Sequence, residues 1–125
     1  MKPEELKYTK DHVWVAVEGD IAQMGITDFA QKELGEVVFI ELPEIGRKCT
    51  QGQAVGSIES VKTSNDLLAP LTGEVMEVNE FLREKPDTVN GEPYGKGWMM
   101  RMKISLPAEV QQLMSFEAYE THIKG

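Results

Sequence analysis

The amino-acid sequence predicts a mainly β protein, built as a sandwich or barrel of short strands, with a short internal helix and a C-terminal helical segment. Apolar and polar side chains alternate in several short segments between residues 12 and 104, as they do along half-buried strands. Glycine-containing turns separate these segments, which favours a sandwich or barrel over a flat sheet. After Leu106 the apolar spacing changes to that of a helix.

The first predicted element is a hairpin, and a helix and a strand follow it. His12–Val17 alternates with its three valines on one face, residues 18–20 are typical of a turn, and Ile21–Gly25 is the expected returning strand. Thr27 or Asp28 is expected to cap a short helix that ends at Gly35. Residues 36–42 are rich in β-branched and aromatic side chains and stop at a proline, so a strand is predicted there.

The middle of the chain predicts a second hairpin. Residues 43–57 contain glycines at short intervals, which indicates tight turns between short strands. Ala54–Ser60 and Thr63–Ala69 are expected to form the two arms, with residues 61–62 at the tip. Gly73–Val78 alternates again and predicts another strand.

The remaining residues predict a loop, a strand and the helical end. Asn79–Gly97 is expected to be mostly loop, with one helical turn near Glu80–Arg83, because proline, glycine and asparagine are frequent in it. Trp98–Ile104 alternates with its methionines mainly on one face. Pro107 suits the first turn of a helix, and Ser115 is a candidate cap for a further helical stretch.

Length, charge and composition restrict the function. We expect the 125 residues to fold as one domain. The net charge of −8 argues against binding to nucleic acid or an anionic membrane and suits a partner with a basic face. No apolar run is long enough to span a bilayer, and residues 1–10 resemble neither a signal nor a transit peptide, so a cytoplasmic protein is expected.

The cysteine and histidine content argues against disulfide formation and metal binding. Cys49 is the single cysteine, so no internal disulfide forms, which is consistent with a reducing compartment. The two histidines lie far apart in the sequence, and no cluster has the spacing of zinc ligands, so we expect no metal. No nucleophile–base pair is visible either, which makes an enzyme the weakest hypothesis.

Lys62 is the residue with the most specific chemical interpretation. It lies at the expected hairpin tip among small polar neighbours, where a lysine is ordinarily a solvated surface charge. A Schiff-base role is disfavoured because it needs a desolvated amine with a lowered pKa, which an exposed tip does not provide. The functional alternative is a modification site, since a rigid hairpin presents one primary amine to an attaching enzyme.

Six segments then resemble one family, the H proteins of the glycine cleavage system, which are lipoyl carriers. The motif most specific for this family is ESVK followed by a polar run and AP..GEV. The six segments occur in the family's order and cover nearly the whole chain. They are YTKDHVW (8–14), GITDFAQKELG (25–35), VVFIELPEIG (37–46), GSIESVK (56–62), APLTGEVMEVN (69–79) and PYGKGW (93–98).

The resemblance implies a single lipoyl-carrier domain, residues 1–125, with a barrel-sandwich hybrid fold of the lipoyl/biotinyl type. It implies lipoic acid attached to Lys62 as lipoyl-lysine, and a carrier rather than an enzyme. The arm accepts an aminomethyl group at a pyridoxal-phosphate glycine decarboxylase and delivers it to a tetrahydrofolate-dependent aminomethyltransferase. A dihydrolipoyl dehydrogenase then reoxidises the arm, and a lipoyl or octanoyl ligase or transferase attaches it.

The same resemblance suggests roles for four further residues. Glu59 is expected to be part of what the attaching ligase recognises, although a solvent-exposed strand carboxylate is the simpler interpretation. His12 is expected to be a structural hydrogen-bonding residue near the resting groove of the arm. The family usually reads His-Glu-Trp where this chain has Val13, so a carboxylate beside that groove is missing. Asp66, or Asp11 on the same side of an extended strand as Val13, is expected to hold the aminomethyl ammonium instead.

Three other carriers compete with this interpretation. Biotin carriers share the fold but usually flank the lysine with methionines, whereas Val61 and Thr63 flank it here. Lipoyl domains of 2-oxo-acid dehydrogenases are shorter and precede Pro/Ala-rich linkers, and this chain has a helical C-terminus instead. An H-like protein that relays lipoyl groups to other carrier domains stays open as the alternative function.

Overall fold

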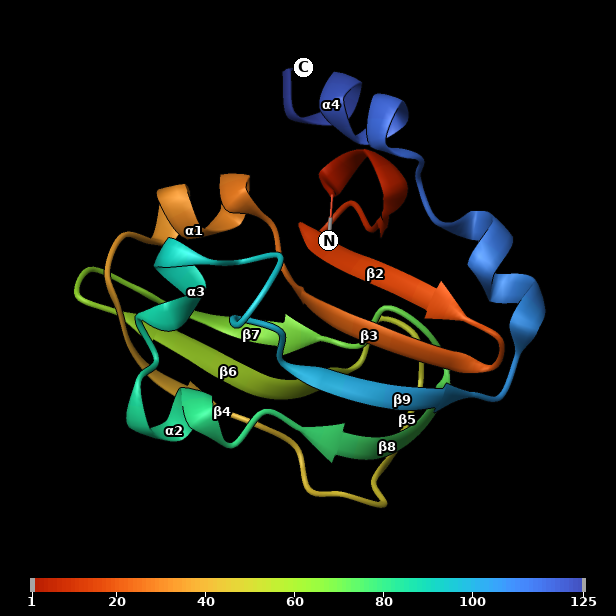
Figure 1. The fold of residues 1–125 in the computed structure, drawn as a ribbon, viewed down its shortest axis with the longest axis horizontal. Helices are drawn as coiled ribbons and strands as arrows, with labels where there is room; N and C mark the ends of the chain where they lie inside the picture. Colours follow the sequence, from red (N-terminus) through yellow and green to blue (C-terminus); the bar gives the residue numbers. More distant parts are fainter. Residues whose placement is uncertain (1, 125) are drawn as a thin grey trace.

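The computed structural model describes residues 2–124, and Met1 and Gly125, the ends of the expected domain, lie outside the described residues. Two antiparallel sheets make up most of the fold (Figure 1). One has the order β1-β2-β3-β9-β8-β5 and the other the order β4-β6-β7. The strands are β1 (Lys7–Tyr8), β2 (Val13–Glu18), β3 (Ile21–Ile26), β4 (Val37–Glu41), β5 (Lys48–Cys49), β6 (Ala54–Ser60), β7 (Ser64–Leu68), β8 (Gly73–Val78) and β9 (Met100–Ile104).

Short helices lie around the two sheets. They are α1 (Asp28–Leu34), α2 (Phe81–Glu84), α3 (Thr88–Gly91) and α4 (Phe116–Lys124), with 3₁₀ turns at Pro3–Glu5 and Pro107–Gln112. In Figure 1 α1 and α3 lie near the tip of the β6–β7 hairpin, and α4 lies beside the N-terminal turn. The arrangement confirms the predicted mainly β fold with an internal helix and a C-terminal helical segment.

The main core forms from side chains of both sheets. Met24, Met100 and Met102 from the six-stranded sheet belong to the same buried cluster as Ile58 and Leu67 from the three-stranded sheet. The two-residue period of each strand explains this, because every second side chain points inward. Burial of these apolar side chains is the main source of stability in such a fold, at about 25 cal/mol per Å² removed from water.

A second, smaller cluster covers the other face of β1 and β2. It consists of Leu6, Tyr8, Trp14 and Tyr119, all buried. The Tyr8 and Tyr119 rings stack with centroids 4.5 Å apart. The Trp14 indole Nε1 donates a hydrogen bond of 2.7 Å to the carbonyl oxygen of Pro93. Because Trp14 and its neighbour Val15 point to opposite faces, β2 is buried on both sides.

One prediction about local structure needs correction. The segment expected to be mostly loop contains α3 as well as α2, because buried Val89 and the long-range hydrogen bonds of Asn90 stabilise a single helical turn that has no periodicity of its own. The C-terminal segment is helical as predicted, and the Ser115 hydroxyl oxygen accepts a hydrogen bond of 3.1 Å from the N–H of Ala118 in α4.

Met114 lies between the 3₁₀ turn and α4 and exchanges backbone hydrogen bonds of 2.9 and 2.7 Å with Tyr8.

Candidate functional site

The β6–β7 hairpin ends in a tight turn with Lys62 at its exposed tip. The backbone N–H of Ser60 donates to the carbonyl oxygen of Thr63 at 2.8 Å, so only two residues connect the arms. The Ser60 hydroxyl oxygen accepts further hydrogen bonds from the backbone N–H groups of Lys62 (3.3 Å) and Thr63 (3.2 Å). Serine suits this position because its short side chain satisfies turn amides locally.

The tip also rests on the segment that joins α1 to β4. The backbone N–H of Val61 donates to the carbonyl oxygen of Glu36 at 2.9 Å. The side chain of Lys62 lies against Gly35, where its Cε would be 3.4 Å from a Cβ placed on that glycine. Gly35 ends α1 with φ +79° and ψ −158°, a conformation that is essentially restricted to glycine. Helix termination therefore depends on Gly35, and the side chain of Lys62 packs along the same residue.

Asn90 holds this supporting segment in place, and no local pattern in the sequence indicates this role. Its side-chain oxygen accepts a hydrogen bond of 2.9 Å from the N–H of Val37. Its amide nitrogen donates to the carbonyl oxygen of Gly35 (2.8 Å) and to the side-chain oxygen of Gln31 (3.0 Å). Asn90 thus connects α3 to the residues beneath the lysine, more than fifty positions earlier in the chain.

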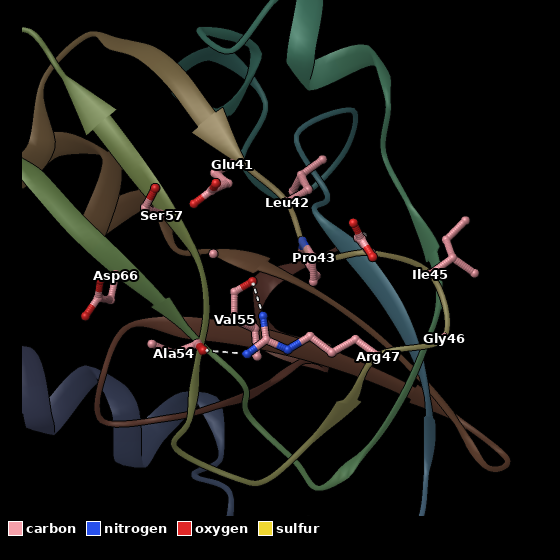
Figure 2. A pocket seen from close by; sticks show the side chains of 12 residues that line it. Glu41, Leu42, Pro43, Ile45, Gly46, Arg47, Ala54, Val55, Ser57 and Asp66 are labelled. Carbon is pink, nitrogen blue, oxygen red and sulfur yellow. Dashed lines mark hydrogen bonds between the residues drawn. The ribbon is translucent and has the colours of Figure 1, made fainter.

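The outer face of the three-stranded sheet carries rows of polar side chains. Strand pairing places Glu59 between Phe39 and Ser64, and Ser57 between Glu41 and Asp66. Glu59 is exposed on this face. The second row borders a groove of about 850 Å³ (Figure 2).

Arg47 lies in the same groove and bonds to the backbone of β6. Its guanidinium donates to the carbonyl oxygens of Ala54 (3.3 Å) and Val55 (3.5 Å). Figure 2 shows Asp66 on the side of the groove formed by β6 and β7. Asp66 therefore lies further down the hairpin, opposite Ser57 and not at the tip beside Lys62.

Asp11 lies elsewhere, and the strand geometry expected for it is wrong. The backbone turns at residues 10–12, where the N–H of His12 donates to the carbonyl oxygen of Thr9 and His12 has φ +68°. Asp11 is exposed and borders a separate cavity of about 520 Å³, whose lining includes Leu68 of β7. Val13 is 3% exposed and points into the main core, so Asp11 and Val13 do not share one face of a strand.

His12 takes part in a hydrogen-bonded group between α1 and α4. Its Nδ1 lies 2.8 Å from the Tyr119 hydroxyl, which lies 2.7 Å from the Thr27 hydroxyl. Burial, and then the nearby His122, lowers the pKa of His12. Burial raises the pKa of Tyr119 to about 12, so this phenol stays protonated at neutral pH. His12 therefore makes a hydrogen bond within the fold, and its expected place near the resting groove of the arm stays a prediction.

Within residues 2–124, no three or more His, Cys, Asp or Glu side chains are grouped so that they could hold a metal ion. No helix in this part of the chain is both long enough and apolar enough to cross a membrane.

Comparisons with known proteins agree on one family. The family described as Glycine cleavage H-protein matches residues 6–125. The glycine cleavage system H protein of Carboxydothermus hydrogenoformans is 52% identical over 118 residues, 94% of this chain and 91% of that protein. The one from Bacteroides thetaiotaomicron is 47% identical over 123 residues, 98% of each chain.

A solved structure gives the same result for the fold. The crystal structure of a glycine cleavage system H protein from Mycobacterium marinum has a TM-score of 0.90 to this chain at 34% identity. The match covers 99% of this chain and 100% of that one. The similarity confirms the barrel-sandwich hybrid fold that the sequence motifs imply.

Proposed function

The chain belongs to the glycine cleavage H-protein family, and on that premise we propose that it carries lipoic acid in amide linkage on Lys62. The observation that carries this proposal is the exposed lysine on a two-residue turn whose backbone is held by Ser60 and Glu36. A fixed turn presents the amine in one direction, so an attaching enzyme meets a defined target. The lysine serves as a tether for the attached group.

The surroundings of Lys62 fit an acylated side chain. Acylation replaces a cation with a neutral amide, and within residues 2–124 the ion pairs are Lys32–Asp28, Arg83–Glu80 and Arg101–Glu77, so none involving Lys62 would be lost. The missing Cβ of Gly35 leaves space along the lysine stem. When bound, the lipoyl group supplies a disulfide that is reduced and reoxidised while it carries a substrate-derived group.

We further propose that residues 1–125 act as a single carrier domain in the cytoplasm and not as an enzyme. The carrier takes an aminomethyl group from a pyridoxal-phosphate glycine decarboxylase to a tetrahydrofolate-dependent aminomethyltransferase. A dihydrolipoyl dehydrogenase and a lipoyl or octanoyl ligase or transferase complete the set of partners. Tethering raises the effective concentration of the carried group at each partner, and the net charge of −8 favours partners with basic faces.

Intact-mass measurement tests the attachment site. The parent chain, incubated with a purified lipoate–protein ligase, lipoate and ATP, is expected to gain one lipoyl group. Lys62→Arg is expected to gain none while unfolding at the parental temperature, because the side chain is exposed. Lys32→Arg, also exposed, is the matched control and should be modified normally. Uptake of the lipoyl mass by Lys62→Arg would show that the attachment site lies elsewhere.

Asp66, Asp11 and His12 remain proposed contacts of the arm or of a cationic amine that it carries. An ammonium held against protein needs an acceptor or a counter-charge, and Val13 supplies neither. Asp66→Asn, Asp11→Asn and the double variant are expected to shorten the lifetime of the loaded carrier, measured by ammonia release. Because the two aspartates border different cavities, the single variants show which one acts. Parental lifetimes in all three variants would exclude both carboxylates.

A further inference from the structure

We propose that the enzyme that acylates Lys62 docks on a small apolar surface formed by a β-bulge next to the lysine hairpin. This surface, the bulge patch, consists of the exposed apolar side chains of Val38, Phe39 and Val61. The proposal rests on the attachment of lipoate to Lys62 and names what the attaching enzyme contacts. It concerns the unmodified chain, before any arm is present.

The bulge changes which side chains of β4 face solvent. Val37 pairs with Ser60 and Phe39 pairs with Glu59, so Val38 is an extra residue on β4. Regular alternation would turn one of two successive residues inward. Here Val38 is 49% and Phe39 is 52% exposed. Bulges often occur next to functional sites, where they redirect side chains.

The patch is continuous with the hairpin tip. Phe39 stands directly across from Glu59, which places the two side chains on the same face of the sheet. Val61, also exposed, is joined to the start of β4 by its hydrogen bond to Glu36. Glu59 pairs with Ser64 at the end of the hairpin, one residue before the turn that carries Lys62. β4 is an edge strand of its sheet, and although α2 contacts it, the side chains of Val38 and Phe39 are about half exposed and open to a partner.

The length of the side chain that each partner meets identifies the acylating enzyme as the one that docks beside the tip. That enzyme acts on the bare amine, which extends from the turn by only one lysine side chain, so its surface must contact the residues around the tip. Partners that act later meet the end of a much longer lipoyl-lysine arm and can bind further away. Aromatic side chains, phenylalanine included, are enriched in protein interfaces, and Phe39 lies exposed beside the target.

Charge defines the partner further. Glu36 and Glu59 border the apolar side chains, and neither takes part in the ion pairs found in residues 2–124. An apolar pocket with a basic rim is therefore complementary to the bulge patch.

Two phenylalanines with similar exposure make the test specific. Phe39 is 52% exposed in the bulge patch, and Phe81 is 45% exposed on α2. With purified lipoate–protein ligase, lipoate and ATP, Phe39→Ser is expected to lower the rate of lipoyl uptake at sub-saturating carrier by about tenfold or more. Phe81→Ser should keep the parental rate. Val38→Thr, which preserves side-chain shape and β-branching, is a second patch variant and should also slow uptake.

Competition separates docking from chemistry. Lys62→Arg cannot be acylated at residue 62, and it is expected to inhibit lipoylation of the parent chain by occupying the ligase. The double variant Lys62→Arg/Phe39→Ser should fail to inhibit, whereas Lys62→Arg/Phe81→Ser should inhibit normally. Circular dichroism and thermal unfolding confirm that each variant is folded.

The outcomes distinguish this proposal from the proposed function. Uptake by Phe39→Ser and Val38→Thr at the parental rate, with full competition by the double variant, overturns the docking surface alone. A parent chain that gains no lipoyl group at Lys62 overturns both proposals. Analytical ultracentrifugation tests whether the chain associates with itself through the bulge patch. If the parent chain is a dimer and Phe39→Ser is a monomer, the patch binds a second copy of the chain and the proposal is overturned.

Discussion

The two sheets use their second faces differently. The six-stranded sheet is covered on both sides at β1 and β2, where Trp14 and Tyr8 pack with Tyr119 of α4. The three-stranded sheet packs one face on the core and leaves the other open, with Phe39, Glu59 and their neighbours in contact with solvent.

The difference separates stability from recognition. Buried aromatic side chains hold the N-terminal strands and the C-terminal helix together, so changes there should cost folding free energy. The open face contributes few buried contacts, so it is free to carry the lysine, the carboxylates and the exposed apolar side chains. Substitutions on the covered faces of the six-stranded sheet should therefore lower stability and change lipoyl uptake little. Substitutions on the open face of the three-stranded sheet should change lipoyl uptake and affect stability little.

The largest expected effect on stability is in the covered sheet. Trp14→Ala should lower the free energy of unfolding by about 3–5 kcal/mol, since it removes a fully buried indole and leaves a cavity. Trp98, which is only partly buried and has Arg101 over its ring, offers the control. Denaturant unfolding of Trp14→Ala and Trp98→Ala measures the contrast. Equal losses in the two variants would contradict the larger contribution expected from the fully buried Trp14.

Gly35 lies between α1 and β4, the edge strand of the three-stranded sheet. Its replacement should lower the free energy of unfolding by an intermediate amount. Gly35→Ala is expected to cost about 1–3 kcal/mol, because φ +79° with ψ −158° suits only glycine. The added Cβ also contacts the stem of Lys62, so lipoyl uptake should slow. Gly91→Ala, where a Cβ meets open space, should have little effect on either measurement. Parental stability in Gly35→Ala would show that this backbone conformation is not required.

The free energy of unfolding should also depend on pH through His12, which contacts Tyr119 on the covered side of the six-stranded sheet. Folding lowers the pKa of His12, so the unfolded chain binds more protons than the folded chain at acid pH. The contribution of His12 to stability is therefore complete above the ordinary pKa of 6.5 and falls as the pH drops from 6.5 through the lowered pKa. His12→Asn removes this titration, and asparagine tolerates the φ of +68°. The unfolding temperature of the parent should therefore fall more between pH 7.5 and pH 5.5 than that of the variant. Parallel curves would assign the pH dependence to other groups.

The smallest effect is expected on the open face. Glu41→Gln changes an exposed side chain that takes part in none of the ion pairs of residues 2–124, so its free energy of unfolding should stay within about 0.5 kcal/mol of the parent. Chemical denaturation measures this directly. A loss above about 1 kcal/mol would mean that the outer face contributes to stability after all.

Several elements could be predicted from the sequence because their determinants are local. Ala54–Ser60 and Gly73–Val78 are strands with the predicted bounds. Thr27 accepts the hydrogen bond of a helix cap, and Gly35 ends that helix as expected. Alternation of apolar and polar side chains, helix capping and turn formation all depend on residues a few positions apart. A single sequence is therefore enough to predict them.

The support of the lysine was decided only by the tertiary structure. Asn90 binds Gly35 and Val37, the bulge at Val38 is defined only by pairing with β6, and Asp11 leaves the strand direction because the chain turns at His12. Each of these depends on segments that are distant in sequence or on a backbone angle that packing imposes. The sequence by itself determined the longer strands, the capped helix and the position of Lys62 at a hairpin tip. Packing decided what surrounds that tip, because hydrogen bonds and strand registers form between partners that the local pattern does not specify.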